Sequence, residues 1–318
     1  MAGYERNLVL VHTPNFQARS DFETISAKLA ERAPDIETFI VSNLARHSVT
    51  RRDAAGRPTM IFSPVALRQF KPVRGSIFAG RSHSKMEEIR RLGEGGLRVP
   101  ESVMIEPQTQ LDPATWGELT VVKPNRGMQG AGVMLRRTRD VRWADPNSWP
   151  KDDPRHGVPL VAQKFIDTGA HPTSYRVLAI FGRPLYSAVS RSMQPRSRSL
   201  DLAGEPDGPV ASNLEEPIAS NVGVRGFELN FEADVIAYGA SAASAFPEVP
   251  VLGVDVIREE ATGHLWILEV NAGGLTWHIS SNYGMVLQRK YGIDLAAQFG
   301  ALDVAADALI EVTRREAV

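Results

Sequence analysis

Short apolar runs alternate with an amphipathic segment along the first 80 residues. The run Leu8–Val11 is followed by helical spacing of apolar residues over 21–33, and Ile36–Val41 and Pro58–Ser63 are again short and apolar. Buried strands of a parallel sheet produce such runs, and helices between the strands produce the wider spacing. The pattern predicts a small parallel α/β unit at the start of the chain.

A helix is predicted to begin at Ser84, because Ser84 can cap its first turn and Glu87 stands three residues further on. The glycines of Gly93–Gly96 follow this segment instead of opening a helix. They therefore favour a helix C-cap over a dinucleotide-binding loop, which needs its glycines ahead of a helix. A second unit is expected to start near this point.

Two later segments have the composition of loops, and one has the periodicity of a core helix. Asp145–Pro154 is rich in proline and aspartate, and Ser192–Arg225 is polar with many glycines, prolines and serines. Long loops in compact domains are commonly lids, binding loops or disordered segments, so Ser192–Arg225 is expected to be mobile without a ligand and is a candidate for a part that closes over one. The apolar stripe from Leu302 to Val312 is expected to pack in the core rather than against a partner.

Composition excludes several classes of protein. The 318 residues carry 36 Lys and Arg against 37 Asp and Glu, a formal net charge of −1, which disfavours binding of nucleic acid or a membrane surface through bulk charge. The chain has no cysteine, so disulfides, thiolate zinc sites and cysteine nucleophiles are excluded. No apolar run is long enough for a signal peptide or a membrane span, and a cytoplasmic protein is expected.

Several familiar catalytic motifs are missing from the sequence. No P-loop, HExxH or GxSxG pattern occurs, and the seven histidines are scattered without the spacing of metal ligands. Any chemistry must therefore come from other arrangements of residues.

The most informative segment is a predicted antiparallel hairpin. Val251–Ile257 and Leu265–Val270 are apolar runs separated by a polar turn. A turn centred on Thr262 places Asp255 directly opposite Glu269. Because like charges in that position repel, a positive group is expected between them.

A metal ion is one candidate for that positive group. Asn271 follows Glu269 by two residues, so its side chain lies on the same face of the strand. Two carboxylates and an amide oxygen suit Mg²⁺, with Mn²⁺ as an alternative, and suit zinc poorly. The competing interpretation is that one carboxylate is protonated or pairs with an arginine.

A lysine and a glycine-rich loop form a second constellation. The apolar strand Leu119–Val122 delivers Lys123, and three glycines follow within residues 127–132. Backbone N–H groups of such a loop can approach phosphate oxygens without obstruction by Cβ atoms. A glycine-rich hairpin turn without a ligand is an equal alternative. Leu160–Asp167 then runs from an apolar strand into a turn that could present backbone groups to a purine.

In this order and spacing the motifs resemble the ATP-grasp superfamily, and most nearly its RimK-like glutamate ligase branch, over roughly Lys85–Asp294. The motifs that carry the resemblance lie at residues 122–132, 163–166, 175–182, 220–221, 253–255 and 268–271. The resemblance implies an α/β fold of ATP-grasp type, with a small N-terminal parallel domain at 1–84. Two nucleotide-clasping lobes at 85–167 and 168–318 are implied in addition.

The resemblance also implies nucleotide contacts. Those to the phosphates of ATP would come from Lys85, Lys123 and the loop residues Gly127, Gln129, Gly130, Ala131 and Gly132. The adenine pocket would be lined by Gln163, Lys164, Phe165 and Ile166.

The same resemblance implies the groups around the reacting atoms. Asp255, Glu269 and Asn271 match the magnesium ligands. Arg191 and Asn221 match positions near the γ-phosphate and the acyl phosphate, and Arg176 matches a residue that holds a substrate or phosphate anion.

The implied activity is that of an ATP-dependent carboxylate–amine ligase, which uses Mg²⁺ and forms an amide or peptide bond through an acyl phosphate. Its partners would be a small-molecule carboxylate and an amine such as an amino acid or a peptide, without nucleic acid or membrane, and a homo-oligomer is left open. Two alternatives remain: a phosphotransferase that acts on a hydroxyl, and a nucleotide-binding module without chemistry.

Overall fold

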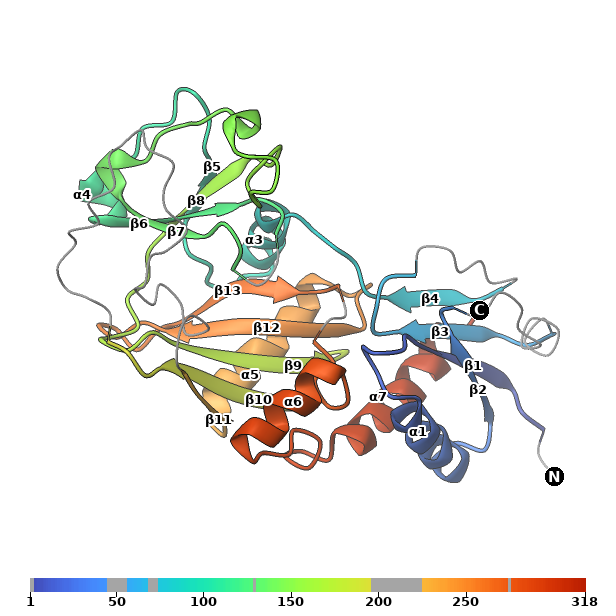
Figure 1. The fold of residues 1–318 in the computed structure, drawn as a ribbon. Coiled ribbons are helices and arrows are strands. Elements are labelled where there is room, and N and C mark those ends of the chain that lie inside the picture. Colours follow the sequence, from blue (N-terminus) through green and yellow to red (C-terminus); the bar gives the residue numbers. More distant parts are fainter. Residues whose placement is uncertain (1–2, 45–55, 68–73, 128–129, 196–224, 274–275) are drawn as a thin grey trace.

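Three sheets, each with its own helices, make up the fold (Figure 1). The computed structural model describes residues 3–44, 56–67, 74–127, 130–195, 225–273 and 276–318. Gln129, Asn221 and most of Ser192–Arg225 lie outside the described residues, so their expected roles stay predictions. None of the helices in these ranges is both long and apolar enough to cross a membrane.

The N-terminal sheet is the parallel unit that the sequence predicts. Its elements are β1 (Arg6–His12), α1 (Arg19–Arg32), β2 (Ile36–Ser42), β3 (Thr59–Ser63) and β4 (Ser76–Ala79), and the strand order is β2-β1-β3-β4. Leu8 and Leu10 of β1 are fully buried with Phe22 and Leu29 of α1. The alternation of strand and helix thus follows directly from the apolar spacing.

The central unit is an antiparallel sheet of order β5-β8-β6-β7. Its elements are α3 (Lys85–Glu94), β5 (Ser102–Met104), α4 (Pro113–Trp116), β6 (Leu119–Pro124), β7 (Met134–Arg137) and β8 (Leu160–Lys164), with single 3₁₀ turns at Thr138–Asp140 and Pro146–Ser148. The predicted limits of α3 are confirmed. Ser84 caps its start by accepting from Glu87 N–H, and Gly95 and left-handed Gly96 end it.

The third unit contains a five-stranded antiparallel sheet of order β11-β10-β9-β12-β13. Its elements are β9 (Thr173–Ile180), β10 (Arg183–Ser192), β11 (Arg225–Leu229), α5 (Ala233–Ser241), a 3₁₀ turn (Ala242–Ala245), β12 (Val251–Arg258), β13 (Leu265–Asn271), α6 (Asn282–Tyr291) and α7 (Ala301–Glu316). One face packs on α5 through Val177, Val235 and Val254, and the other packs on α6 and α7 through Leu178, Ala188 and Leu287.

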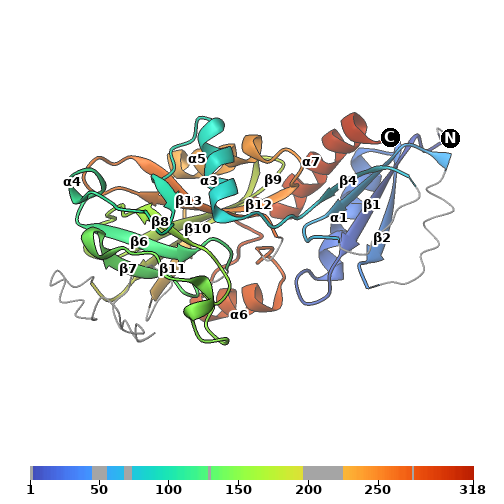
Figure 2. The same ribbon diagram turned by 90° about the horizontal axis from the view of Figure 1, so that it is seen from above.

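The C-terminal helix α7 joins the third sheet to the N-terminal unit. It packs against both α1 and β10, and its predicted core stripe is confirmed, because Ala305, Leu309 and Val312 are buried. Beyond it, Val318 exchanges backbone hydrogen bonds with Thr59 of β3. Figure 2 shows α7 where the N-terminal unit meets the rest of the molecule. The last residues of the chain therefore pack with the first domain.

Candidate active site

The predicted pairing of the two carboxylates is confirmed. Asp255 of β12 lies directly opposite Glu269 of β13, and Gly253 lies opposite Asn271. The register shifts between Asp255 and Val256, so that Val256 faces Ile267. Because of this irregularity, Ile267 packs in the α5 core while Glu269 and Asn271 lie on the opposite face of the sheet.

Each carboxylate has a cation beside it. Lys85 Nζ lies 2.6 Å from Glu269 Oε2, and Arg176 of β9 donates two hydrogen bonds to Asp255, one of them at 2.9 Å. Asn271 Nδ2 lies 3.3 Å from Asp255 Oδ2. Asp255 therefore pairs with an arginine, as the competing interpretation of the hairpin predicts. Glu269 pairs with Lys85, which the resemblance predicts to contact the phosphates of ATP.

The same three side chains also fit a magnesium ion. Asp255, Glu269 and Asn271 converge at one place, and all three carry the hard oxygen ligands that Mg²⁺ prefers. No group of three or more His, Cys, Asp and Glu residues suited to a metal occurs in the described part of the chain. The amide oxygen of Asn271 is thus the third protein ligand that such a site would have.

The charges around Glu269 keep it ionised. Burial would raise the pKa of this carboxyl, but Lys85 and then Lys123 outweigh burial and hold the pKa at about 2. For Asp255, burial and the charge of Glu269 raise the pKa against the opposing effect of Arg176. Of the two carboxyl groups, Glu269 is therefore the one that stays ionised to the lower pH.

Lys123 lies in the interior of the cluster. It is 6% exposed, and its Nζ donates to Gln163 Oε1 of the neighbouring strand β8 at 2.8 Å. Burial, followed by the charge of Lys85, lowers the pKa of Lys123 to about 8. A lysine held so far from water is a strong candidate for contact with an anion.

Glu88 is a buried acid that sequence reasoning missed. It lies on α3, is 7% exposed and accepts a hydrogen bond from the backbone N–H of Val270, next to Glu269. Burial raises the pKa of Glu88 to about 8, although Lys85 and Lys123 oppose this. The sequence carried no signal for it, because acids in the first turn of a helix are common on solvated surfaces.

The glycine loop joins β6 to β7 as a hairpin connection. Gly130 and Gly132 both have positive φ values, of 72° and 74°. A Cβ at Gly132 would approach Pro124 to 2.9 Å, so glycine is required there by both conformation and space. Gly127 and Ala131 lie in the same connection, directly after the strand that carries Lys123. The glycines are thus accounted for by a hairpin turn without a ligand. Contact between this loop and phosphate stays a prediction.

Of the four expected adenine contacts, Gln163 accepts a hydrogen bond from Lys123. Lys164 Nζ turns to the backbone oxygen of Thr115 at 2.8 Å. Ile166 is buried and Phe165 is half-buried. Gln163 thus links the connector to the charged cluster.

Arg176 lies on the same face of the sheet as Asp255, whereas Arg191 does not. Directly opposed residues of antiparallel strands share a face, and Arg176 lies opposite Ala188 and Asp255. Arg191, three residues after Ala188, is exposed and points to the other face, opposite Thr173. The structure therefore does not bring Arg191 to the cluster. Ser190 occupies the site-facing position on this strand.

The segment that follows Asn271 covers the same face. Thr276 stacks on Gly253, where a Cβ would lie 2.6 Å from its methyl group, and Tyr186 OH donates to Thr276 O at 3.0 Å. His278 meets the ring of Tyr283 edge-on at 5.1 Å. Burial, then Arg176 and Arg225, lower the pKa of His278 to about 3, so it is neutral.

We expect Gly284→Ala to destabilise the protein by at least about 1 to 3 kcal/mol, the usual cost of overpacking. A Cβ at this position in α6 would lie 2.1 Å from the backbone oxygen of His278. Urea unfolding measures the change. Gly93→Ala is the matched control, because Gly93 lies in α3 with nothing within 4 Å of its Cβ position, and alanine should stabilise that helix by about 0.5 to 1 kcal/mol. Equal stability of the Gly284 variant and the wild type would contradict this tight packing.

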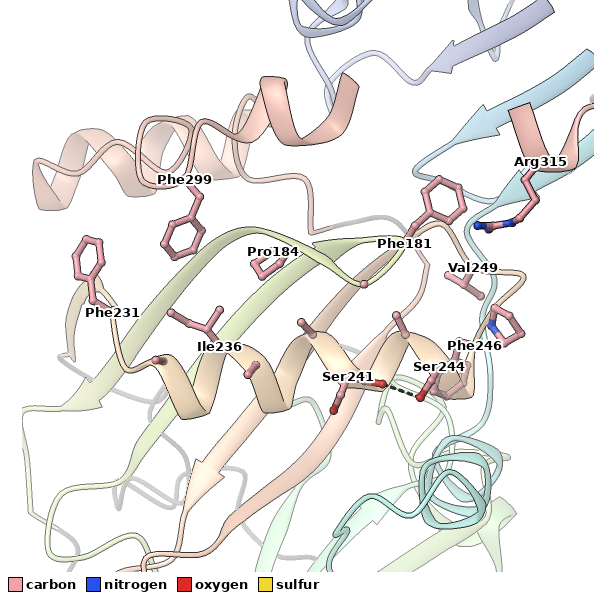
Figure 3. A pocket seen from close by; sticks show the side chains of 16 residues that line it. Phe181, Pro184, Phe231, Ile236, Ser241, Ser244, Phe246, Val249, Phe299 and Arg315 are labelled. Atoms are coloured by element: carbon pink, nitrogen blue, oxygen red, sulfur yellow. Dashed lines mark hydrogen bonds between the residues drawn. The ribbon is translucent and has the colours of Figure 1, made fainter. Parts of the chain in front are cut away.

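A large apolar groove lies apart from these residues. It has a volume of about 980 Å³ and is bordered by α5, the turn at Phe181 and the aromatic side chains of Phe231, Phe246 and Phe299. Figure 3 shows the phenylalanines around it and the hydrogen bond between Ser244 and Ser241. None of the predicted site residues borders this groove, so the candidate active site is the charged cluster.

Comparison with known proteins gives the fold. No family model matches the chain, and no curated protein matches its sequence. The solved structure of D-cycloserine synthetase DcsG is similar over 96% of this chain and 99% of its own, at 16% identity and a TM-score of 0.50. The structure of D-alanine–D-alanine ligase from Bacillus anthracis matches over 98% of each chain at 14% identity and a TM-score of 0.47. The ATP-grasp ligase PsnB matches over 96% of this chain and 98% of its own, at 14% identity and 0.48.

Such low identity speaks to the fold and not to the reaction. The predicted fold class is confirmed: the chain has an α/β fold of ATP-grasp type, with one parallel sheet and two antiparallel sheets.

Proposed function

We propose that the protein is an ATP-dependent carboxylate–amine ligase of the RimK-like kind, acting in the cytoplasm on a small-molecule or peptide acid and an amine. The observation that carries the proposal is the convergence of charged groups beside Asp255 and Glu269. Lys85, Lys123 and Arg176 supply three cations there, brought from α3, the central sheet and the third sheet. Three neighbouring cations suit a ligand with several negative charges, such as a polyphosphate.

The chain's own residues have separable tasks in this proposal. Lys85 and Lys123 bind the phosphates, and the loop from Gly127 to Gly132 covers them and keeps out water, which would hydrolyse an acyl phosphate. Arg176 faces the same place and stabilises negative charge on the transferred group. Asp255, Glu269 and Asn271 would hold Mg²⁺, which supplies charge neutralisation at the phosphates.

The proposed reaction has two steps. The carboxylate of the acid attacks the γ-phosphorus of ATP, which forms an acyl phosphate and releases ADP. The amine then attacks the acyl carbon, and the C–O bond to phosphate breaks. An amide, inorganic phosphate and a proton result. A phosphotransferase would instead move the phosphoryl group to a hydroxyl, with no free phosphate.

Trapping with hydroxylamine tests this function without knowledge of the amine. An acyl phosphate reacts with hydroxylamine to give a hydroxamate and inorganic phosphate. We expect the protein, Mg·ATP and pooled amino and dicarboxylic acids to yield hydroxamates of identifiable mass. ADP formation without hydroxamate, but with a phosphorylated product, would establish the phosphotransferase, and binding of ATP without turnover would establish a nucleotide-binding module.

A further inference from the structure

Strand β11 begins with a cation on the site face of the sheet. Arg225 lies directly opposite Ser192, and Ser192 follows Ala188 by four residues. Alternation along β10 therefore places Arg225 on the same face as Arg176 and Asp255. The sequence marked Arg225 only as the end of a loop.

Arg225 contacts both ends of α6. Its backbone oxygen accepts from Tyr291 OH at 3.1 Å, at the end of that helix. Its Nη2 donates to Tyr283 OH at 2.9 Å, near the start of the helix. The two tyrosines are eight residues apart, about 12 Å at 1.5 Å per residue. The guanidinium therefore lies close to His278, which packs on Tyr283.

Among the described residues, no acid pairs with the arginine at this end of the site. Arg176 is paired with Asp255, but across the described ranges no carboxylate forms an ion pair with Arg225, whose contacts are Tyr283 OH and the ring of Phe227. The neighbouring His278 is neutral, since burial and the two arginines lower its pKa.

We propose that Arg225, oriented by Tyr283, binds an oxyanion of the acid substrate, an inference that rests on the proposed ligase function. A guanidinium presents paired N–H donors that match carboxylate and phosphate oxygens alike. The oxyanion has two sources: the reacting carboxylate with its transferred phosphoryl group, or a second carboxylate of a diacid.

Paired acids that differ by one charge separate the two sources. Aspartate and asparagine, glutamate and glutamine, and glutarate and its monoamide are compared in the hydroxamate assay with wild type, Arg225→Met and Arg289→Met. Arg289 is the control, because it is an exposed cation on α6 whose hydrogen bond within the described ranges goes to the backbone oxygen of Met285. A loss of about ten- to a hundredfold in kcat/KM for Arg225→Met on the diacids alone identifies a second carboxylate. An equal loss in kcat on both members of each pair identifies the reacting group.

A binding measurement keeps the proposal testable if turnover is absent. Inorganic phosphate is titrated by calorimetry in the presence of Mg·ADP, and Arg225→Met should weaken its binding about ten- to a hundredfold while Arg289→Met leaves it unchanged. If the methionine variant does not fold, Arg225→Lys and Tyr283→Phe serve in its place. Unchanged phosphate binding and turnover in the folded Arg225 variants would overturn the proposal, and so would a larger loss in Arg191→Met. Absence of hydroxamate from the wild type, with phosphate binding still dependent on Arg225, would refute the ligase function and leave the oxyanion site.

Discussion

Glu269→Gln is expected to reduce ATP turnover by about a hundredfold or more while the protein stays folded. The substitution keeps the shape of the side chain and removes the carboxylate that pairs with Lys85 and lies opposite Asp255. Loss of one preorganised electrostatic group in an active site typically costs about 10²- to 10³-fold in kcat. The measurement is ADP formation under saturating Mg·ATP, together with the rise in melting temperature that Mg·ATP produces.

The apo protein should lose a little stability in this variant. In the folded protein the two lysines hold the pKa of Glu269 at about 2, below its usual 4.5, so the ionised form favours folding. That contribution is present above pH 4.5 and disappears as the pH falls toward 2. Wild type and Glu269→Gln should therefore converge in stability on acidification. If the two carboxylates merely repelled each other, the variant would melt higher than the wild type at neutral pH.

Glu228→Gln is the matched control, because it makes the same charge change at an exposed position of β11 on the same sheet. It should leave both turnover and the effect of Mg·ATP unchanged. Turnover at the wild-type rate in folded Glu269→Gln would contradict the assignment of this carboxylate to the site.

The sequence was sufficient to predict the hairpin that pairs Asp255 with Glu269, because the information for a hairpin is local. Two apolar runs around one polar turn permit few registers, and the one that opposes Asp255 and Glu269 is observed. The irregularity after Asp255 was not predictable in the same way. It arises because Ile267 is drawn into the α5 core while Glu269 must face the other side, a conflict that exists only once the helix is in place.

The positions of the arginines show where sequence reasoning failed. Arg191 and Ser190 are adjacent in the chain, and a single step in strand alternation decides which of them faces Asp255. The register of β10 depends on an irregularity between Pro184 and Tyr186, ahead of these residues, which shifts every later side chain relative to β9. Arg225 reaches the site face through its pairing with β10, which no local pattern specifies.

Contacts between elements that are distant in the sequence could not be predicted either. Glu88 becomes buried only when α3 packs against β13, and α7 contacts α1 only when the end of the chain packs on the N-terminal unit. Both depend on tertiary packing. Sequence periodicity indicates which face of a helix is buried, but not which element packs against that face.

Lys123→Met is expected to weaken ATP binding about ten- to a hundredfold, the usual value of a charge-assisted hydrogen bond, and to leave adenosine binding unchanged. Lys123 is buried beside Gln163, so its ammonium has a fixed direction toward the cluster. Calorimetry with ATP and with adenosine separates the phosphate contact from the base contact. Lys151→Met, in an exposed loop, is the control for loss of one positive charge.

Without ATP, Lys123→Met should not destabilise the protein, whereas loss of a salt bridge usually does. Burial lowers the pKa of Lys123 from 10.5 to about 8, so the folded state binds fewer protons than the unfolded state between these values. Stability contributed by this group therefore rises with pH from about 8 to 10.5 in the wild type and is absent from the variant. Because methionine removes a buried charge, Lys123→Met should match or exceed the wild type in melting temperature at pH 7, and the difference should fall as the pH increases.

The same titration couples ATP binding to protons. Phosphate contact favours the charged lysine, so ATP should bind the wild type with constant affinity below about pH 8 and progressively more weakly above it, as the free protein loses this proton. Calorimetry at pH 8.5 in buffers of different ionisation enthalpy should reveal proton uptake in the wild type and less in Lys123→Met. If ATP affinity and proton uptake are both unaffected by the substitution, Lys123 does not contact phosphate, and the glycine loop that follows it loses its proposed role as a phosphate cover.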